Sequence, residues 1–242
     1  MNVALITGAS SGIGLEAALE IDHRFTSLDE VWIIGRNEEK LRILSKRLRH
    51  NNRIIIMDLT DSDDMDAFEG VLKELKPNIR MLFQSAGEGL HQRFDEMNRA
   101  EAKNMLRLNC EALTNMTSIC LPYMKAGSRI IQIASSAAYV HIPSFGLYSA
   151  TKAFVLSFTK SLRKELKKRK IYVTAVCPGP VDTPFFEKSE RYTNGVIPLK
   201  KLIMNSPRNV AIKAICDAGF KRKVSYDTPL IAILSFFAKW FM

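Results

Sequence analysis

The sequence predicts a doubly wound α/β fold, in which a parallel sheet of about seven strands carries helices on both faces. Short apolar segments alternate along the chain with charged segments of helical periodicity, the pattern of successive strand–helix–strand units. A turn rich in glycine directly follows the first apolar segment. With 242 residues, 47% of them hydrophobic and 25% charged, the chain is long enough to form one sizeable core.

Each expected strand is a short apolar run, separated from the next by a segment long enough for a crossover helix. We expect the strands at residues 2–7, 31–35, 53–57, 80–84, 128–134, 171–177 and about 222–226. Right-handed crossovers between these strands give helices on both faces. We expect a single domain over residues 1–242, with an insert over the substrate site at about 184–206 and an apolar tail at 229–242.

Composition and charge narrow the classes of function. Four cysteines lie far apart without a CxxC pair, so we expect reduced thiols and no metal site: Cys110, Cys120, Cys177 and Cys216. The first residues resemble a strand rather than a secretion signal, and no apolar run has the length of a spanning helix, so a cytoplasmic protein is expected. The net charge is +10, but no stacking motif or recognition helix accompanies it, so no nucleic-acid partner is expected.

The turn at residues 7–14 is a candidate phosphate-binding site. Gly8, Gly12 and Gly14 permit a tight turn and a close approach of the backbone to a pyrophosphate. The helix that follows presents unpaired N–H groups and the positive end of its dipole. The spacing is Gly-x3-Gly-x-Gly, not Gly-x-Gly-x-x-Gly, and such a turn can simply join a strand to a helix. The strand–turn–helix context favours dinucleotide binding by a Rossmann-type sheet.

Two residues at the ends of the second and third strands bear on the choice of cofactor. Where dinucleotide folds often have an acidic residue for the ribose 2′-hydroxyl, this chain has Arg36. A guanidinium can pair with a 2′-phosphate, so NADP(H) is expected in preference to NAD(H), although a solvated surface arginine is the alternative. Asp58 either accepts a hydrogen bond from the adenine amino group or caps the helix that begins near Asp61.

A candidate acid–base group lies in the second half of the chain. Tyr148 and Lys152 are four residues apart, so on a helix they share one face, and Ser135 follows the fifth expected strand. Free tyrosine has a pKa near 10, too high for efficient acid–base catalysis at neutral pH. A nearby ammonium favours the phenolate and lowers that pKa. The pair therefore makes chemical sense, although Tyr-x-x-x-Lys alone is common on helix surfaces.

Taken together, these features make the chain resemble the short-chain dehydrogenase/reductase family over nearly its full length. The features that carry the resemblance occur in family order: the glycine turn, Asp58, Asn109, Ser135, Tyr148, Lys152 and Pro178-Gly179-Pro180-Val181-Asp182-Thr183. The resemblance implies that Tyr148 donates a proton to the substrate carbonyl and that Ser135 hydrogen-bonds the same oxygen. It implies that Lys152 binds the nicotinamide ribose and lowers the pKa of Tyr148, and that Asn109 positions a water for proton relay.

The resemblance also implies which residues hold the cofactor. These are Gly8, Ser10, Ser11, Gly12, Ile13, Gly14, Arg36, Asp58, Leu59, Ala86, Gly87, Tyr148, Lys152, Pro178, Gly179, Val181 and Thr183. The chain departs from the family at Ser85, where an asparagine usually bridges neighbouring strands. Serine is shorter, so we expect this link to be lost or mediated by water, with reduced local rigidity.

The expected activity is NADP(H)-dependent interconversion of a carbonyl and an alcohol, on a hydrophobic ketone or aldehyde or a lipid-like substrate. The expected substrate-contacting residues are Ser135, Tyr148, Phe185 and Phe186. One alternative is a dehydrogenase of a small hydroxy acid or alcohol. An alternative from another class is a non-catalytic dinucleotide sensor or scaffold, and the intact set of Ser135, Tyr148 and Lys152 argues against it.

Two kinds of partner besides the substrate are considered. The family resemblance implies a homo-dimer or homo-tetramer formed through helices near 98–120 and 148–169. The apolar tail 229–242, preceded by Lys221-Arg222-Lys223, is too short to span a bilayer. It can pack over the substrate pocket or against another subunit, or it can lie on an anionic membrane surface as a peripheral contact.

Overall fold

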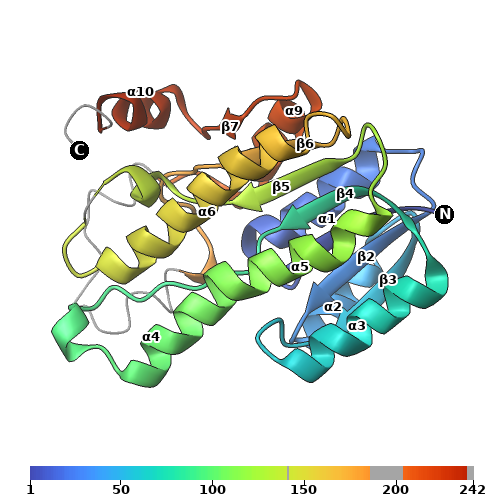
Figure 1. Cartoon of the computed structure of the whole chain (residues 1–242), viewed down its shortest axis with the longest axis horizontal. Coiled ribbons are helices and arrows are strands. Elements are labelled where there is room, and N and C mark those ends of the chain that lie inside the picture. Colours follow the sequence, from blue (N-terminus) through green and yellow to red (C-terminus); the bar gives the residue numbers. More distant parts are fainter. Residues whose placement is uncertain (141, 186–203, 239–242) are drawn as a thin grey trace.

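A seven-stranded parallel sheet lies at the centre of the protein, in the strand order β3-β2-β1-β4-β5-β6-β7. The computed structural model describes residues 1–140, 142–185 and 204–238 (Figure 1). The strands are β1 (Asn2–Thr7), β2 (Glu30–Gly35), β3 (Asn51–Ile56), β4 (Asn78–Gln84), β5 (Arg129–Ile133), β6 (Tyr172–Val176) and β7 (Val224–Ser225). All seven predicted strands are present with small shifts at their ends, and the predicted fold class is confirmed.

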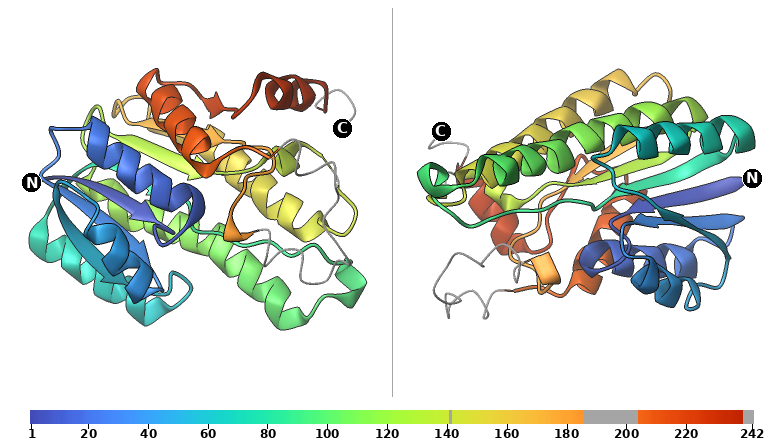
Figure 2. Two further views of the ribbon diagram at one scale, coloured as in Figure 1. Left: turned by 180° about the vertical axis from the view of Figure 1, so that it is seen from behind. Right: turned by 90° about the horizontal axis from the view of Figure 1, so that it is seen from below.

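Helices cover both faces of this sheet, as the right-hand view of Figure 2 shows. The helices are α1 (Gly12–Arg24), α2 (Glu38–Ser45), α3 (Ser62–Leu75), α4 (Arg99–Leu106), α5 (Ala112–Cys120), α6 (Gly146–Glu165), α9 (Pro207–Gly219) and α10 (Pro229–Ala238). Apolar residues of α1, α2 and α9 pack with Ile6 and Ile33 on one face. Those of α3, α5 and α6 pack with Leu5 and Trp32 on the other. Successive strand residues point to opposite faces of the sheet. Because the central strands are apolar at nearly every position, both faces are apolar.

The first turn of α3 shows which residue caps this helix, a role that the sequence left open for Asp58. The side chain of Asp61 accepts hydrogen bonds from the backbone N–H groups of Asp63 and Asp64, so Asp61 is the N-cap. The interpretation of Asp58 as the helix cap is therefore wrong. Its own backbone N–H donates to the Asp64 carboxylate, which ties the end of β3 to the first turn of α3.

A buried ladder of polar side chains joins the middle of the sheet to two helices. The amide of Gln132 on β5 donates to Gln84 on β4 over 2.8 Å. Thr117 on α5 donates to Gln84, and Thr159 on α6 donates to Gln132. All four side chains are buried, and their hydrogen bonds offset the free-energy cost of burying polar groups. The strand link expected to weaken at Ser85 is made one residue earlier, by Gln84.

The strand order places the site. The chain runs outward from β1 through β2 to β3 and then returns to β4 on the other side of β1. At such a switch point the loops after the two central strands diverge and leave a crevice at the carboxyl ends of the strands. Pro184 and Phe185, at the start of the predicted insert, line this crevice, and a β-bridge between Val181 and Asn205 joins the segments on either side of the insert. Residues 186–203 of the insert lie outside the described residues.

Candidate active site

One cavity of about 690 Å³ joins the glycine turn to Tyr148 along the carboxyl ends of the strands. Sixteen of the predicted cofactor residues line it: Gly8, Ser10, Ser11, Gly12, Ile13, Arg36, Asp58, Leu59, Ala86, Gly87, Tyr148, Lys152, Pro178, Gly179, Val181 and Thr183. The predicted substrate residues Ser135 and Phe185 line it too, whereas Phe186 lies outside the described residues. Gly14 and Asn109 are not among the lining residues, and their roles are indirect.

The glycine turn has the backbone geometry of a phosphate cradle. Gly8 has φ +68°, and a Cβ there would lie 2.8 Å from the backbone nitrogen of Ala86. A Cβ on Gly14 would lie 2.3 Å from the carbonyl oxygen of Gly8, so Gly14 lets α1 begin directly against the turn. Ser11, the N-cap of α1, makes no side-chain cap hydrogen bond, and the first turn has no acidic residue. These features fit a dinucleotide pyrophosphate at the start of α1.

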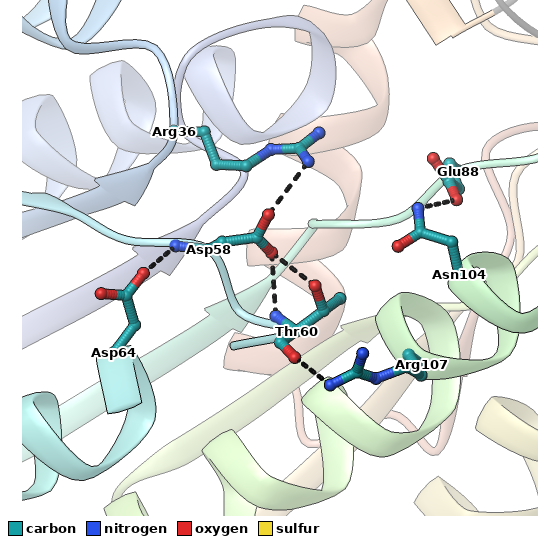
Figure 3. A network of polar contacts seen from close by, with 7 residues as sticks. All are labelled: Arg36, Asp58, Thr60, Asp64, Glu88, Asn104 and Arg107. Atoms are coloured by element: carbon teal, nitrogen blue, oxygen red, sulfur yellow. Dashed lines mark hydrogen bonds and ion pairs between the residues drawn. The ribbon is translucent and has the colours of Figure 1, made fainter. Parts of the chain in front are cut away.

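An arginine–aspartate pair lies beside the glycine turn, at the same end of the cavity, because β2 pairs with β1 (Figure 3). Nη1 of Arg36 donates to Oδ2 of Asp58 over 3.2 Å, and the other carboxylate oxygen accepts from Thr60. Burial alone would raise the pKa of Asp58, but the hydrogen bonds from Thr60 and Arg36 outweigh it and lower that pKa. Arg36 is thus both paired with Asp58 and exposed at the mouth of the cavity, and its role in cofactor binding stays a prediction. Arg107, at the end of α4, donates to the carbonyl of Thr60 and holds this loop from the other side.

Lys40 is a second cation at this end that the sequence analysis missed. It lies one turn into α2, whose N-cap Asn37 accepts a hydrogen bond from the Lys40 backbone N–H. Asn37 and Lys40 both line the cavity, so the capped first turn of α2 borders it. A basic residue four positions after Arg36, just inside a capped helix, is the signal that could have found it.

Tyr148, Ser135 and Lys152 come together as predicted. Tyr148 and Lys152 lie on the buried face of α6, and Nζ of Lys152 is 5.6 Å from the centre of the Tyr148 ring. Lys152 donates to the carbonyl oxygen of Ile133 over 2.9 Å, which fixes the ammonium beside the end of β5. Oγ of Ser135 accepts a hydrogen bond from the backbone N–H of Ala137, and this leaves its own hydroxyl hydrogen for another acceptor.

Burial dominates the electrostatics of these groups. It raises the pKa of Tyr148 to about 12, against a hydrogen bond with Ser135 that lowers it. It lowers the pKa of Lys152 to about 8, because the ammonium is fully enclosed. Burial therefore sets the net direction for Tyr148, and the lowering of its pKa by Lys152 stays a prediction. At neutral pH Tyr148 carries its proton, which is the state that an acid catalyst requires.

Asn109 holds the loop after β4 against α6. It lies in a single π-helical turn, Arg107–Glu111, between α4 and α5, a distortion often found at functional sites. Its side chain accepts from the backbone N–H of Glu88 and donates to the Glu88 carbonyl and to Thr151. This side chain is buried, and both N–H hydrogens of its amide are used. The expected placement of a water by Asn109 stays a prediction; the observed contacts position Glu88 and its neighbours.

A row of aromatic rings, here called the aromatic row, encloses the reactive phenol. Phe145 stacks on Tyr148 with ring centres 4.3 Å apart, and Phe185 lies 5.4 Å away. His91 continues the row at 5.6 Å from Phe145. Several residues at this end of the cavity were missed by the sequence analysis: Glu88, Gly89, His91, Ile142, Phe145 and Pro184. They come from separate loops, and no local pattern marks them.

Comparison with known proteins agrees with this geometry. The model of the short chain dehydrogenase family matches residues 2–193. An uncharacterized oxidoreductase of Staphylococcus epidermidis is 30% identical over 190 residues, which cover 78% of this chain and 81% of that protein. An uncharacterized oxidoreductase of Staphylococcus aureus is 32% identical over 184 residues, 75% of this chain and 78% of that protein.

Two solved structures are similar over almost the whole chain. A short-chain dehydrogenase from Sphingobium yanoikuyae in complex with NADPH has a TM-score of 0.84 at 25% identity, covering 99% of this chain and 91% of that one. A bulky-bulky ketone specific alcohol dehydrogenase from Comamonas testosteroni has a TM-score of 0.78 at 26% identity, covering 94% and 86%. The protein is thus an oxidoreductase acting on alcohols and carbonyls with NAD(P), and the chain belongs to the short chain dehydrogenase family.

Proposed function

We propose that this protein is an NADP(H)-dependent reductase of hydrophobic ketones or aldehydes, with Tyr148 as its acid–base group. The observation that carries the proposal is the shape of one cavity. It has a phosphate cradle at the glycine turn, and Tyr148 lies at its other end between the rings of Phe145 and Phe185. A carbonyl that reaches Tyr148 from that end is bordered by apolar and aromatic side chains.

The preference for NADP(H) is supported by two cations at the end of the cavity where Arg36 and Asp58 lie, here called the adenosine end. Arg36 presents a guanidinium that can pair a 2′-phosphate, and Lys40 adds a second positive charge in the same part of the cavity. Asp58 pairs with Arg36 and keeps that guanidinium oriented. The similar dehydrogenase from Sphingobium yanoikuyae was solved with NADPH, which agrees with this assignment.

The reaction follows from the placement of three side chains. When NADPH is bound along the cavity, it would supply the hydride that the carbonyl carbon accepts. Tyr148 donates its proton to the carbonyl oxygen, and Ser135 donates a hydrogen bond to the same oxygen as negative charge develops on it. Lys152, held by the Ile133 carbonyl, places a positive charge near the phenol and favours the phenolate left behind. Microscopic reversibility gives alcohol oxidation, in which the phenolate takes the proton.

The charges at the substrate end favour a neutral substrate over a small hydroxy acid. Glu88 lines the cavity there, and its carboxylate accepts a hydrogen bond from Asn104 (Figure 3). Among the described residues, the lining cations are Arg36 and Lys40 at the adenosine end and Lys152 beside Tyr148. A substrate carboxylate would thus face Glu88 without a further cation to pair with. A solved relative with similar structure is named as specific for bulky-bulky ketones.

NADPH consumption against a panel of carbonyls tests this proposal. The panel runs from pyruvate through acetone and straight-chain methyl ketones to cyclohexanone and acetophenone. Turnover is expected to rise with apolar size, because each buried methylene adds about 0.8 kcal/mol of favourable transfer free energy. The kcat/KM values for each ketone are the measurement. Turnover of pyruvate alone would favour the hydroxy-acid alternative and contradict the proposal.

The contacts of α10, the first part of the apolar tail, support a packing role for it. A Cβ on Gly179 would lie 2.9 Å from Cδ1 of Ile231, so α10 rests directly on a residue of the cavity. Asp227, just before α10, accepts from the Gly179 backbone N–H. Leu230 and Ile233 are more than half exposed, and these leave an apolar surface for a membrane or another subunit. No helix in the described part of the chain is long and apolar enough to cross a bilayer.

Peripheral membrane contact by this surface has a direct test. If the tail lies on anionic lipid, the protein is expected to co-sediment with phosphatidylserine vesicles. Changing Leu230 and Ile233 together to Glu is expected to abolish co-sedimentation, because two carboxylates cannot enter the membrane interface. Ketone turnover by the double variant is the control, because Ile231 keeps α10 on Gly179. Absence of co-sedimentation by the unaltered protein would leave packing as the role of the tail.

Self-association is a further part of the proposal. The expected interface helices correspond to α4, α5 and α6, and Leu106 and Phe154 on them are 46% and 42% exposed. Large apolar side chains on adjacent helices favour burial against a second copy. We propose a homo-dimer or homo-tetramer on this basis.

A further inference from the structure

Three loops at the amino-terminal edge of the sheet carry a concentration of positive charge. They are residues 124–128, 166–171 and 220–223, which precede the neighbouring strands β5, β6 and β7, and they are here called the basic edge. These strands are parallel, so the basic edge lies opposite the cavity, which is at their carboxyl ends. It has eight exposed cations and no carboxylate: Lys125, Lys167, Lys168, Arg169, Lys170, Lys221, Arg222 and Lys223.

Hydrogen bonds join the three loops into one surface. The guanidinium of Arg169 donates to the carbonyl of Met124 over 3.1 Å, which ties the second loop to the first. Arg163, in the last turn of α6, donates to the carbonyl of Lys221 over 2.6 Å and ties the third loop to the same helix. Seven of the eight cations have no ion pair with a carboxylate of the described residues. Like charges are therefore held side by side on one face, which favours an anionic partner.

The helix dipole explains only part of this charge. Cations stabilise the last turn of a helix, and the effect falls off beyond that turn. The last turn of α6 already has Arg163 and Lys164, so the four consecutive cations at 167–170 lie beyond it. Lys170 and Lys221 have φ of +54° and +59°, a backbone conformation that favours glycine and is strained for lysine. Strained residues cluster at functional positions, so folding alone does not account for lysine at these two places.

An exposed aromatic ring at one end of the basic edge indicates which anion it fits. Phe220 directly precedes Lys221 and is 78% exposed, more than any other large apolar side chain of the described residues. A ring flanked by cations is suited to a membrane interface, where the ring enters the headgroup region and the cations meet anionic lipid. A nucleic acid fits less well. Arg169 and Arg222 are engaged within the protein, and Phe220 is the only aromatic residue of the three loops, so successive bases have no rings to stack on.

We propose that the basic edge is a docking surface for anionic membranes, with Phe220 inserted among the headgroups and the lysines beside the anionic lipids. The inference does not depend on the proposed reaction. It directs the cavity away from the bilayer, so that the cofactor enters from water. In Figure 1 α10 lies far from the N-terminus, where the amino-terminal edge of the sheet begins, so the basic edge and α10 are separate surfaces that variants can distinguish.

Co-sedimentation with lipid vesicles tests this surface. The unaltered protein is expected to sediment with vesicles that contain phosphatidylserine, not with phosphatidylcholine alone, and to be released by salt, which screens the attraction. Changing Lys167, Lys168 and Lys223 together to Ala is expected to weaken binding about 100-fold, because each cation contributes separately to the attraction. Phe220→Ala is expected to weaken binding about tenfold at every salt concentration, since burial of an apolar ring is not screened.

Matched variants make the same changes away from the basic edge. Arg42, Arg99 and Lys103 are exposed on α2 and α4, and changing them together to Ala removes the same charge. Phe94→Ala removes a ring that is 71% exposed outside the three loops. Both variants are expected to change vesicle binding little. None of the altered residues lines the cavity, so thermal unfolding and ketone turnover of every variant are expected to stay near the unaltered values.

Several outcomes would overturn the docking surface. Equal sedimentation with both kinds of vesicle would do so, as would unchanged binding after the triple lysine substitution. Loss of binding only when Leu230 and Ile233 are changed to Glu would assign the membrane contact to α10 instead. Binding of a labelled DNA duplex that the triple lysine substitution removes, without binding to vesicles, would identify a nucleic-acid surface. Absence of ketone turnover in the unaltered protein would contradict the proposed function and leave this inference standing.

Discussion

Replacing Tyr148 by Phe is expected to lower kcat for ketone reduction by about 10²–10⁴-fold, the usual contribution of a positioned acid–base group. The phenyl ring keeps the stacking on Phe145 and the contact with Phe185, so the cavity retains its shape. Only the phenolic hydroxyl, whose hydrogen the carbonyl oxygen would receive, is removed. Steady-state NADPH consumption measures the loss, and titration of NADPH fluorescence shows whether the cofactor still binds.

Tyr139→Phe is the matched control for this substitution. Tyr139 is also a buried tyrosine close to α6, but its hydroxyl pairs with that of Tyr226 and it does not line the cavity. Its replacement is expected to cost about 1 kcal/mol of stability, from the lost hydrogen bond, and to leave kcat near the unaltered value. Equal turnover by the unaltered protein and Tyr148→Phe would contradict the assigned role of the phenol.

The pH profile of the unaltered protein belongs to the same prediction. Burial raises the pKa of Tyr148 to about 12, so the phenol keeps its proton throughout the working range. Burial lowers the pKa of Lys152 to about 8, so Lys152 is charged below this pH and neutral above it. Reduction is therefore expected to be steady at neutral pH and to decline above about pH 8. In Tyr148→Phe the residual turnover is expected to lose this decline, because there is no phenolate left to stabilise.

Replacing Arg36 by Ala is expected to lower kcat/KM with NADPH about 10- to 100-fold while changing that with NADH little. A charge-assisted hydrogen bond is worth about 1.5–3 kcal/mol, and NADPH alone has the 2′-phosphate to receive it. The loss also leaves the Asp58 carboxylate without the ion pair that now neutralises it, so a dianionic phosphate would meet an unpaired negative charge. The ratio of kcat/KM for the two cofactors is the measurement.

Arg42→Ala provides the comparison for Arg36→Ala. Arg42 lies on α2, forms an exposed ion pair with Glu38 and does not line the cavity. Arg42→Ala removes the same charge from nearly the same part of the protein, so a general electrostatic effect on cofactor binding would appear in both variants. The cofactor ratio is expected to change only with Arg36. If Arg36→Ala weakens NADPH and NADH equally, the pairing of Arg36 with a 2′-phosphate is wrong.

Several features could be read from the sequence because they depend on neighbours along the chain. The apolar runs set the seven strands, since burial of alternate or continuous side chains follows a local period. The glycine turn, the Tyr148–Lys152 spacing and the position of Arg36 are likewise local, and all of them line the same cavity. Strand ends shifted by a residue or two because they depend on pairing with other strands.

Other features were decided only by the folded chain. Arg36 and Asp58 are 22 residues apart, and Gln84 and Gln132 are 48 apart, so no periodicity pairs them. The aromatic row takes His91, Phe145 and Phe185 from three separate loops around Tyr148. The sequence determined the strands, the phosphate turn and the acid–base pair by itself. The tertiary structure decided which polar groups are paired and what surrounds the phenol, because parallel strands bring together loops that are distant along the chain.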